Sequence, residues 1–232
     1  MKNIYRKMKR FIKVLLGKDC FIKPDFKCNH KRFGSQYGGW DIVADELNSN
    51  SIIYSFGVGE DASFDMALIR EIGVTIHAFD PTPKSIKWVK AQNFPKSFIM
   101  HEYGIADFDG IVTFNPPENP DHVSHTILQR VETKDQAIEV PIKKLKTIVT
   151  ELKHSKIDLL KMDIEGAEYS VLKDMESVNI RPKQLLIEFH HRFPNVGMGE
   201  TKKAIRIVKR MGYGLFSVSS SGEEYSFIFK NG

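Results

Sequence analysis

Hydrophobic residues follow two different periods along this chain, and from residue 51 onward the two periods alternate. Short apolar runs, typical of buried strands, are separated by segments in which apolar residues recur every three or four positions, as in amphipathic helices. The apolar runs predict strands at 51–56, 74–79, 97–100, 111–114, 157–162, 184–189, 213–218 and 225–229. The helical periods predict helices at 63–72, 84–92, 142–152, 167–175 and 201–211.

This alternation indicates the fold class. Strands that alternate with helices form a mostly parallel sheet with helices on both faces. The last two strands are joined by the short polar turn SSSGEE, so they form a hairpin and add an antiparallel strand. We therefore predict a doubly wound, Rossmann-like α/β fold with a seven-stranded sheet, in which the first five parallel strands are ordered 3-2-1-4-5.

The first 32 residues differ from the rest in charge. They hold eleven Lys or Arg against two acidic residues, a balance of +9, whereas residues 33–232 carry a net −4. We predict a basic leader at 1–32 and a single domain at 33–232. A nucleic-acid protein would carry its basic residues across the folded body, so no nucleic-acid partner is expected.

Within the leader, residues 1–17 have the pattern of a basic amphipathic helix. Its apolar face either packs on its own domain or on a sister subunit in an oligomer, or lies on an anionic membrane surface. The chain has no apolar run of membrane-spanning length, no signal-peptide pattern and only two cysteines without metal-ligand spacing. We expect a cytoplasmic protein, with peripheral membrane contact through 1–17 as the alternative.

A glycine turn follows the strand at 51–56. Gly57 and Gly59 let the backbone turn sharply and approach a ligand, and the helix that follows offers free N–H groups. About 20 residues later Asp80 ends the next strand, where a carboxylate can accept hydrogen bonds from both ribose hydroxyls. These features predict a cofactor with an adenosine end.

The residues after the turn separate two kinds of cofactor. The spacing of Gly57, Gly59 and Ala62 satisfies the loose dinucleotide pattern, so an NAD(P)-dependent oxidoreductase is the alternative. However, Glu60 and Asp61 stand where a pyrophosphate would need neutral or basic surroundings, and acids there favour a cationic cofactor. A dinucleotide also needs a second mononucleotide-binding half, and the terminal hairpin takes the place of the strands that would extend that half.

Six motifs occur in one order across residues 51–191: IIYSFGVGEDASFD, HAFDPTP, GIADFDGIVTF, VPIKKLKTIV, IDLLKMDIEGAEYSVL and QLLIEFH. In this they resemble the FkbM-type methyltransferases, which use S-adenosylmethionine and have the class I methyltransferase fold. The resemblance implies that Gly57 and Gly59 frame the methionine part of the cofactor and that Asp80 holds the ribose. It also implies that Ile105-Ala106-Asp107 borders the adenine and that Asp163 faces the sulfonium. The neighbouring residues Phe56, Val58, Asp61 and Pro81 are also expected to contact the cofactor. Ser55 departs from the family, which usually has an acid there.

Methyl transfer requires alignment of donor and acceptor, and a hydroxyl acceptor must also lose a proton to a base or a metal. Asp163 and Glu165 are two residues apart, as are Glu188 and His190, so each pair shares a face of an extended strand. We predict His190 as the base, with Asp163 and Glu188 beside it and His191 as its substitute. No metal is predicted; the alternative is a divalent ion held by Asp163, Glu188 and His190.

The acceptor site should come from irregular segments. Tyr37 and Trp40 lie in FGSQYGGW, and His125 lies in DHVSHTIL, while Glu165 and His191 would reach the acceptor from strand ends. Aromatic and hydroxyl groups on loops suit a sugar or polyol, and equally suit a loop that covers the cofactor. The expected function is O-methylation of a small-molecule or glycan hydroxyl. A non-catalytic binding module on the same fold is the remaining alternative.

Overall fold

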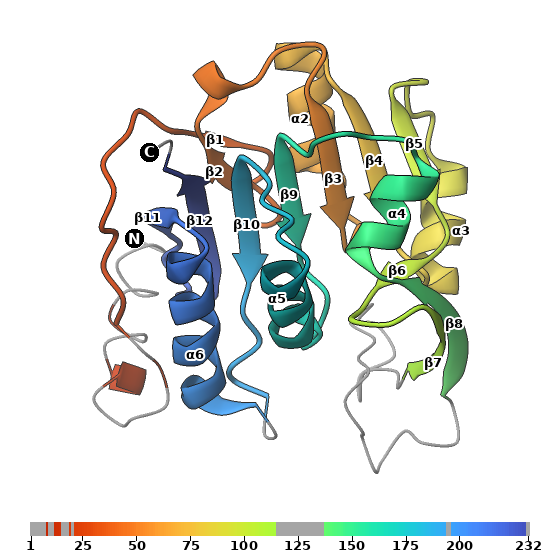
Figure 1. Cartoon of the computed structure of the whole chain (residues 1–232). Helices are drawn as coiled ribbons and strands as arrows, with labels where there is room; N and C mark the ends of the chain where they lie inside the picture. The colour runs from red at the N-terminus through yellow and green to blue at the C-terminus, as the bar shows by residue number, and fades with distance from the viewer. Residues whose placement is uncertain are drawn as a thin grey trace.

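The computed structural model describes residues 8, 12–14, 19, 21–114, 137–193 and 196–230. Its centre is a seven-stranded sheet in the order β11-β12-β10-β9-β3-β4-β5 (Figure 1). The strands are β3 (Ile52–Phe56), β4 (Thr75–Phe79), β5 (Phe98–His101), β9 (Leu159–Met162), β10 (Gln184–Glu188), β11 (Tyr213–Val218) and β12 (Glu224–Phe229). The predicted α/β fold class is confirmed.

Strand direction also agrees with the prediction. β5, β4, β3, β9 and β10 pair in parallel, and their order corresponds to the predicted 3-2-1-4-5. β12 pairs antiparallel with both β10 and β11, which forms the terminal hairpin. Because the five central strands run the same way, their carboxyl ends meet along one edge of the sheet, the lower edge in Figure 1.

Helices cover both faces of the sheet. α2 (Ser63–Ile72) and α3 (Pro83–Ala91) lie on one face, and α4 (Leu145–Glu151), α5 (Glu168–Ser177) and α6 (Gly197–Arg210) on the other (Figure 1). Each face has its own hydrophobic core cluster, containing Phe64 and Leu68 of α2 on the first face and Leu172 and Val208 of α5 and α6 on the second. Burial on both faces explains why the strands read as continuous apolar runs.

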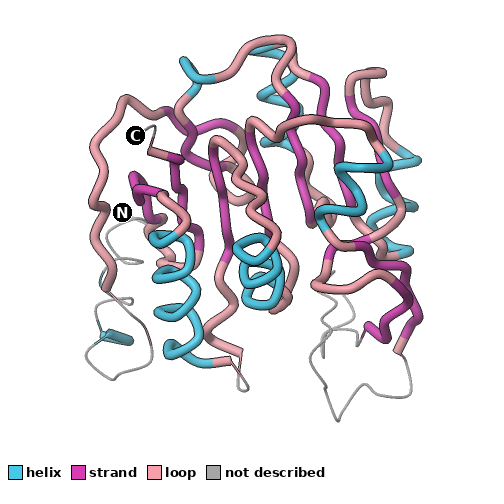
Figure 2. The backbone as a smooth tube through the Cα atoms, viewed as in Figure 1, coloured by secondary structure: helices cyan, strands magenta, loops and turns pink. Residues whose placement is uncertain are grey.

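Two small sheets were not predicted, although one of their strands, at 111–114, was. One pairs β1 (Lys31–Phe33) with β2 (Trp40–Ile42), followed by the 3-10 turn η1 (Ala44–Glu46). The other orders β6 (Gly104–Ile105), β8 (Ile138–Lys143) and β7 (Gly110–Phe114), and lies beyond the carboxyl edge of the main sheet (Figure 2). β1 spans the predicted boundary between leader and domain.

The helix predicted at 142–152 begins too early. Ile142 and Lys143 belong to β8, where they pair with β6 on one side, while β7 pairs along the other side. α4 starts only at Leu145. Periodicity alone could not find this boundary, because Ile142 and Leu145 are spaced as on a helix although they lie in two different elements.

Most of the predicted amphipathic helix at 1–17 lies outside the described residues; residue 8 and residues 12–14 are helical. Further along the leader, the backbone N–H groups of Asp25 and Phe26 both donate to the carbonyl of Leu215 at 2.9 Å. Among the helices in the described part of the chain, none has the length and apolar character needed to cross a bilayer.

Candidate functional site at the carboxyl edge of the sheet

The glycine turn packs directly against the end of β9. Gly57 and Gly59 have positive φ angles of 82° and 57°, in the left-handed region that favours glycine. A Cβ on Gly57 would lie 1.8 Å from the carbonyl oxygen of Asp163, so a side chain there has no space. The N–H of Asp163 donates to the Phe56 carbonyl at 3.1 Å. The structure thus brings together two predicted cofactor segments that are about a hundred residues apart in the sequence.

Asp80 lies beneath the turn. One of its carboxylate oxygens accepts the N–H groups of Val58 at 3.1 Å and Gly59 at 2.9 Å. The other accepts the N–H and the hydroxyl of Thr82 at 2.9 and 2.6 Å. Four hydrogen bonds use the whole acceptor capacity of a carboxylate. Asp80 therefore fixes the shape of the glycine turn, and its contact with a ribose remains a prediction.

The other predicted cofactor residues surround this turn. The rings of Phe56 and Phe79 stack in the core at 4.2 Å. Val58 is 3% exposed, so its side chain, like that of Phe56, is buried in the core.

The predicted adenine segment lies beside the end of β4. Pro81 lies next to Gly104, since a Cβ on that glycine would be 3.2 Å from the proline ring. Ile105 and Ala106 are buried, whereas Asp107 is exposed. The segment 105–107 thus follows directly from a glycine that contacts the residue after Asp80.

Asp61 connects the turn to the loop between β1 and β2. Its carboxylate accepts the Ser35 hydroxyl at 3.0 Å and the Ser63 N–H at 2.7 Å. Burial alone would raise the pKa of Asp61, but the hydrogen bonds from Ser63 and Ser35 hold it below its usual value. An ionised acid therefore lies beside the glycine turn at neutral pH.

The same loop carries both predicted aromatic residues, and they differ in exposure. Tyr37 is 84% exposed, and partial desolvation of its hydroxyl together with the charges of Asp163 and Glu188 raises its pKa. Tyr37 therefore lies within electrostatic range of the strand-end acids. Trp40 is only 3% exposed and packs in the core with Phe64, so it anchors the end of the loop to the core. Its predicted contact with an acceptor is corrected.

At the ends of β9 and β10 two carboxylates face an imidazole. Nε2 of His190 lies 3.3 Å from Glu165 Oε2 and 3.7 Å from Asp163 Oδ1. Glu165 has a φ of 51°, which is uncommon for a residue other than glycine, and Gly166 follows with a φ of 106°. This tight turn into α5 places Glu165 beside His190. We call Asp163, Glu165 and His190 the strand-end cluster.

Glu168 lies behind the imidazole and was missed by the sequence analysis. Its side chain is fully buried, and Oε1 accepts Nδ1–H of His190 at 2.8 Å. Its oxygens also accept the N–H groups of Ile164 and Gly166 at 3.1–3.2 Å. One buried carboxylate therefore holds both the imidazole and the turn that carries Glu165. The available signal was its place as the last residue of KMDIEGAE and the first residue of α5.

Burial and charge shift two pKa values here. Burial alone would lower the pKa of His190, but the charge and hydrogen bond of Glu168 and the charge of Glu165 raise it well above its usual value. Burial, with the charge of Asp163, raises the pKa of Glu188 to about 9. The site thus holds more carboxyl groups than it can keep ionised, which makes it complementary to a cation.

Two further predicted residues do not join this site. His191 follows His190 directly but is fully buried, with Nε2 3.3 Å from Asp19 Oδ1. It belongs to the contact that holds the leader, where Asp19 also pairs with Arg192 at 2.6 Å, so its predicted role as substitute base or acceptor contact is corrected. His125 lies outside the described residues.

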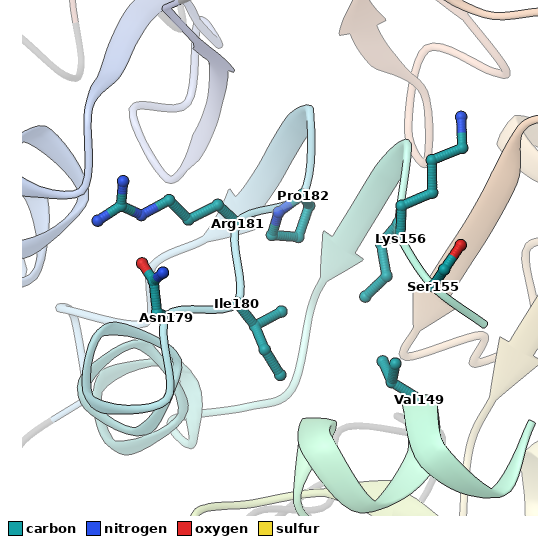
Figure 3. A pocket seen from close by; sticks show the side chains of 8 residues that line it. Val149, Ser155, Lys156, Asn179, Ile180, Arg181 and Pro182 are labelled. Carbon is teal, nitrogen blue, oxygen red and sulfur yellow. The ribbon is translucent and has the colours of Figure 1, made fainter. Parts of the chain in front are cut away.

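A cavity of about 300 Å³ occurs at the opposite edge of the sheet, between the starts of β9 and β10. Figure 3 shows Lys156 and Ile180 among the side chains that line it. It includes none of the predicted site residues. In a parallel α/β sheet, ligands bind at the carboxyl ends of the strands, so the strand-end cluster is the stronger candidate.

Comparison with known proteins decides the family. The family described as "Methyltransferase FkbM domain" matches residues 43–215. The chain belongs to this FkbM methyltransferase family. The match includes the glycine turn, Asp80 and the whole strand-end cluster.

Three proteins illustrate the likeness. The crystal structure of methyltransferase FkbM from Methylobacillus flagellatus KT has the same fold, with a TM-score of 0.51 and 16% identity over 79% of this chain and 44% of that one. Probable methyltransferase-like protein 24 is 25% identical in Rattus norvegicus over 79% of this chain, and 26% identical in Homo sapiens over 72%. This FkbM-family chain spans only 43% and 44% of those two relatives.

Proposed function

We propose that this chain is an S-adenosylmethionine-dependent methyltransferase that methylates a hydroxyl group of a small molecule or a glycan. The observation that carries the proposal is the contact between the glycine turn at Gly57 and the carboxylate–imidazole cluster at Asp163 and His190. A donor held at the turn would have its reacting end beside groups that can receive an acceptor hydroxyl and its proton.

The residues present fit this donor. A side chain on Gly57 would collide with the end of β9, so only glycine lets the turn pack this closely against Asp163. Asp61 and the strand-end acids favour a positive group and oppose a pyrophosphate. We assign the methionine part to Gly57 and Gly59, and the sulfonium to Asp163. These charges are the reason to prefer S-adenosylmethionine over a nicotinamide dinucleotide.

Bound S-adenosylmethionine would supply an electrophilic methyl group for the acceptor oxygen, with the sulfonium sulfur as the leaving group. The chain must align the hydroxyl with that methyl and remove its proton. Alignment of this kind is worth up to about 7–11 kcal/mol. His190 is the group that we assign to the proton, because Glu168 fixes its orientation and Nε2 faces the carboxylates of Asp163 and Glu165. Since its pKa is raised, only its deprotonated fraction can accept the proton, so turnover should rise with pH.

The acceptor class follows from charge and shape. A site lined by several carboxyl groups disfavours an acceptor that carries a carboxylate or phosphate near the reacting oxygen. Tyr37 offers an exposed ring within electrostatic range of Asp163, and aromatic rings suit the apolar faces of sugars. Both features support a neutral polyol or glycan.

The test is methyl transfer from isotopically labelled S-adenosylmethionine to a panel of polyols and oligosaccharides. His190→Gln should lower turnover on any accepted substrate by about 10²-fold or more, the usual contribution of a positioned base. Its affinity for S-adenosylhomocysteine should stay within about threefold, because His190 is assigned to the acceptor rather than to the donor.

The matched control is His30→Gln, which changes an exposed histidine away from the site. It should alter neither turnover nor affinity. Unchanged turnover in His190→Gln would remove His190 from the mechanism. Absence of transfer to every acceptor, with no binding of S-adenosylhomocysteine, would refute the proposed function.

A further inference from the structure

We propose that Asp163, Glu165 and His190 form a binding site for one divalent cation, held by a carboxylate oxygen of each acid and by Nε2 of the imidazole. The inference deepens the proposed function and revises one step of it: an ion would hold the acceptor hydroxyl and lower its pKa, and Nε2 of His190, once bound to the ion, could not also accept the proton. The evidence for the cation site is the placement of these side chains, which does not depend on the proposed function. It differs from the alternative raised by the sequence, because Glu165 takes the place of Glu188.

The separations between the side chains fit a shared ion. One potential ligand atom from each of the three residues lies within 4.8 Å of the other two. Nε2 of His190 is 3.3 Å from Glu165 Oε2 and 3.7 Å from Asp163 Oδ1. Ligands that bind one ion at about 2.1–2.2 Å lie roughly 3–4.4 Å apart. Both distances fall in this range, so an ion fits without a large movement of any of the three side chains.

Glu168 gives His190 the orientation that a ligand requires. It accepts Nδ1–H at 2.8 Å and is held in turn by the N–H groups of Ile164 and Gly166. Histidines that bind metals almost always donate their other ring N–H to a carboxylate, a carbonyl or a water. The fully buried Glu168 carboxylate therefore fixes the ring so that Nε2 is directed toward the two acids.

The carboxyl groups around the site outnumber the basic side chains near them, which favours binding of a cation. Among the described residues, the side chain of Glu188 makes no hydrogen bond or ion pair, and the only ion pair of Asp163 is with His190. The lysine on the same strand, Lys161, instead donates to the Gly57 carbonyl at 2.7 Å. A half-buried carboxyl without a partner, next to three more, is an independent indication that a positive ligand belongs here.

The donor set indicates the kind of ion. Two carboxylate oxygens and one imidazole nitrogen form a mixed set, which Mn²⁺ accepts, whereas Mg²⁺ prefers oxygen alone and structural Zn²⁺ is usually closed by four protein ligands. Three protein ligands leave positions open for water or for an acceptor hydroxyl. We therefore choose Mn²⁺ as the probe, with Mg²⁺ and Zn²⁺ as comparison ions.

The experiment is calorimetric titration of the full chain with MnCl₂ in the absence of any methyl donor. The proposal predicts saturable binding of one ion, weakened at least tenfold by Glu165→Gln and by His190→Gln. Glu168→Gln should weaken it by about 10–100-fold, as for other groups that orient a metal ligand. Glu139→Gln, an exposed acid on β8, is the matched control and should leave Mn²⁺ affinity unchanged.

A second readout locates the ion. Paramagnetic Mn²⁺ should broaden the imidazole proton resonances of His190, identified by their absence in His190→Gln, more strongly than those of His77 on β4 and His101 on β5. Thermal unfolding of each variant shows whether it folds, and Glu165→Gln keeps the test decisive if His190→Gln does not. Absence of saturable binding, or equal affinity in Glu165→Gln and the parent chain, would overturn the cation site.

This result can be separated from a failure of the proposed function. Loss of the cation site with intact binding of S-adenosylhomocysteine overturns only the present inference. Mn²⁺ binding at the three residues without binding of S-adenosylhomocysteine overturns only the proposed methyl donor.

Discussion

Gly57 offers the sharpest structural test, because a single methyl group there should disturb both stability and cofactor binding. In Gly57→Ala the new Cβ would lie 1.8 Å from the Asp163 carbonyl oxygen, and real Cβ atoms essentially never come closer than 3.0 Å to another heavy atom. The end of β9 must therefore move by more than an ångström. The residue must also keep a φ of 82°, which costs a residue with a side chain about 1–2 kcal/mol.

Gly73→Ala separates these two costs. Gly73 has nearly the same φ, 80°, but a Cβ there would meet only the Ser49 Cβ at 3.9 Å, an ordinary contact. Its substitution should lower the free energy of unfolding by about 1–2 kcal/mol, from the backbone alone. Gly57→Ala adds overpacking, typically about 1–3 kcal/mol, so its loss should be about 2–5 kcal/mol.

Urea unfolding measures both losses, and calorimetric titration with S-adenosylhomocysteine measures their effect on the site. A displacement of about 1 Å at a binding or reacting centre can cost 10²-fold. We expect Gly57→Ala to lose at least tenfold in affinity and Gly73→Ala to lose little. Equal affinities in the two variants would refute the placement of the donor at the glycine turn.

Three further predictions follow from other parts of the chain. Asp80→Asn should lower the free energy of unfolding by about 1.5–3 kcal/mol and weaken S-adenosylhomocysteine binding at least tenfold, because it weakens the charged acceptor that holds the Val58 and Gly59 N–H groups; unaltered binding would exclude Asp80 from the donor site. Burial, with the charges of His154 and His101, lowers the pKa of His77 to about 4. Since this folded value lies below the unfolded one, stability is complete above about pH 6.5 and is lost as the pH falls toward 4. His77→Gln should make that decline in unfolding free energy shallower, and an unchanged pH profile would contradict the assignment. Deleting residues 2–17 should abolish co-sedimentation with anionic vesicles if the leader binds membranes; if its apolar face packs on the domain, the deletion should instead lower the unfolding temperature.

The sequence predicted the sheet well because each signal was local. The strand at 52–56, the glycine turn and the helix at 63–72 are adjacent in sequence, so periodicity and turn chemistry sufficed. The antiparallel hairpin was equally local. In contrast, apolar residues at the end of β8 and at the start of α4 are spaced as on one helix, and the last residues of β8 were therefore assigned to the helix.

Within the site, residue types were predicted more reliably than directions. His190 and His191 are adjacent and chemically equal in the sequence, yet one faces the strand-end acids and the other faces Asp19 of the leader. That choice depends on long-range contacts, as does the burial of Trp40 beneath the loop that exposes Tyr37. Glu168 was missed because its buried carboxylate gains a role only when α5 brings it to β10.

The most direct test of the proposed function is calorimetric titration of the purified chain with S-adenosylhomocysteine, with NAD⁺ run under the same conditions. The proposed function predicts saturable binding of S-adenosylhomocysteine and none of NAD⁺, because the turn lies between Asp61 and the strand-end acids. Binding of NAD⁺ alone would contradict the assignment of the methyl donor. Binding of neither compound would indicate a methyltransferase fold that serves as a binding module.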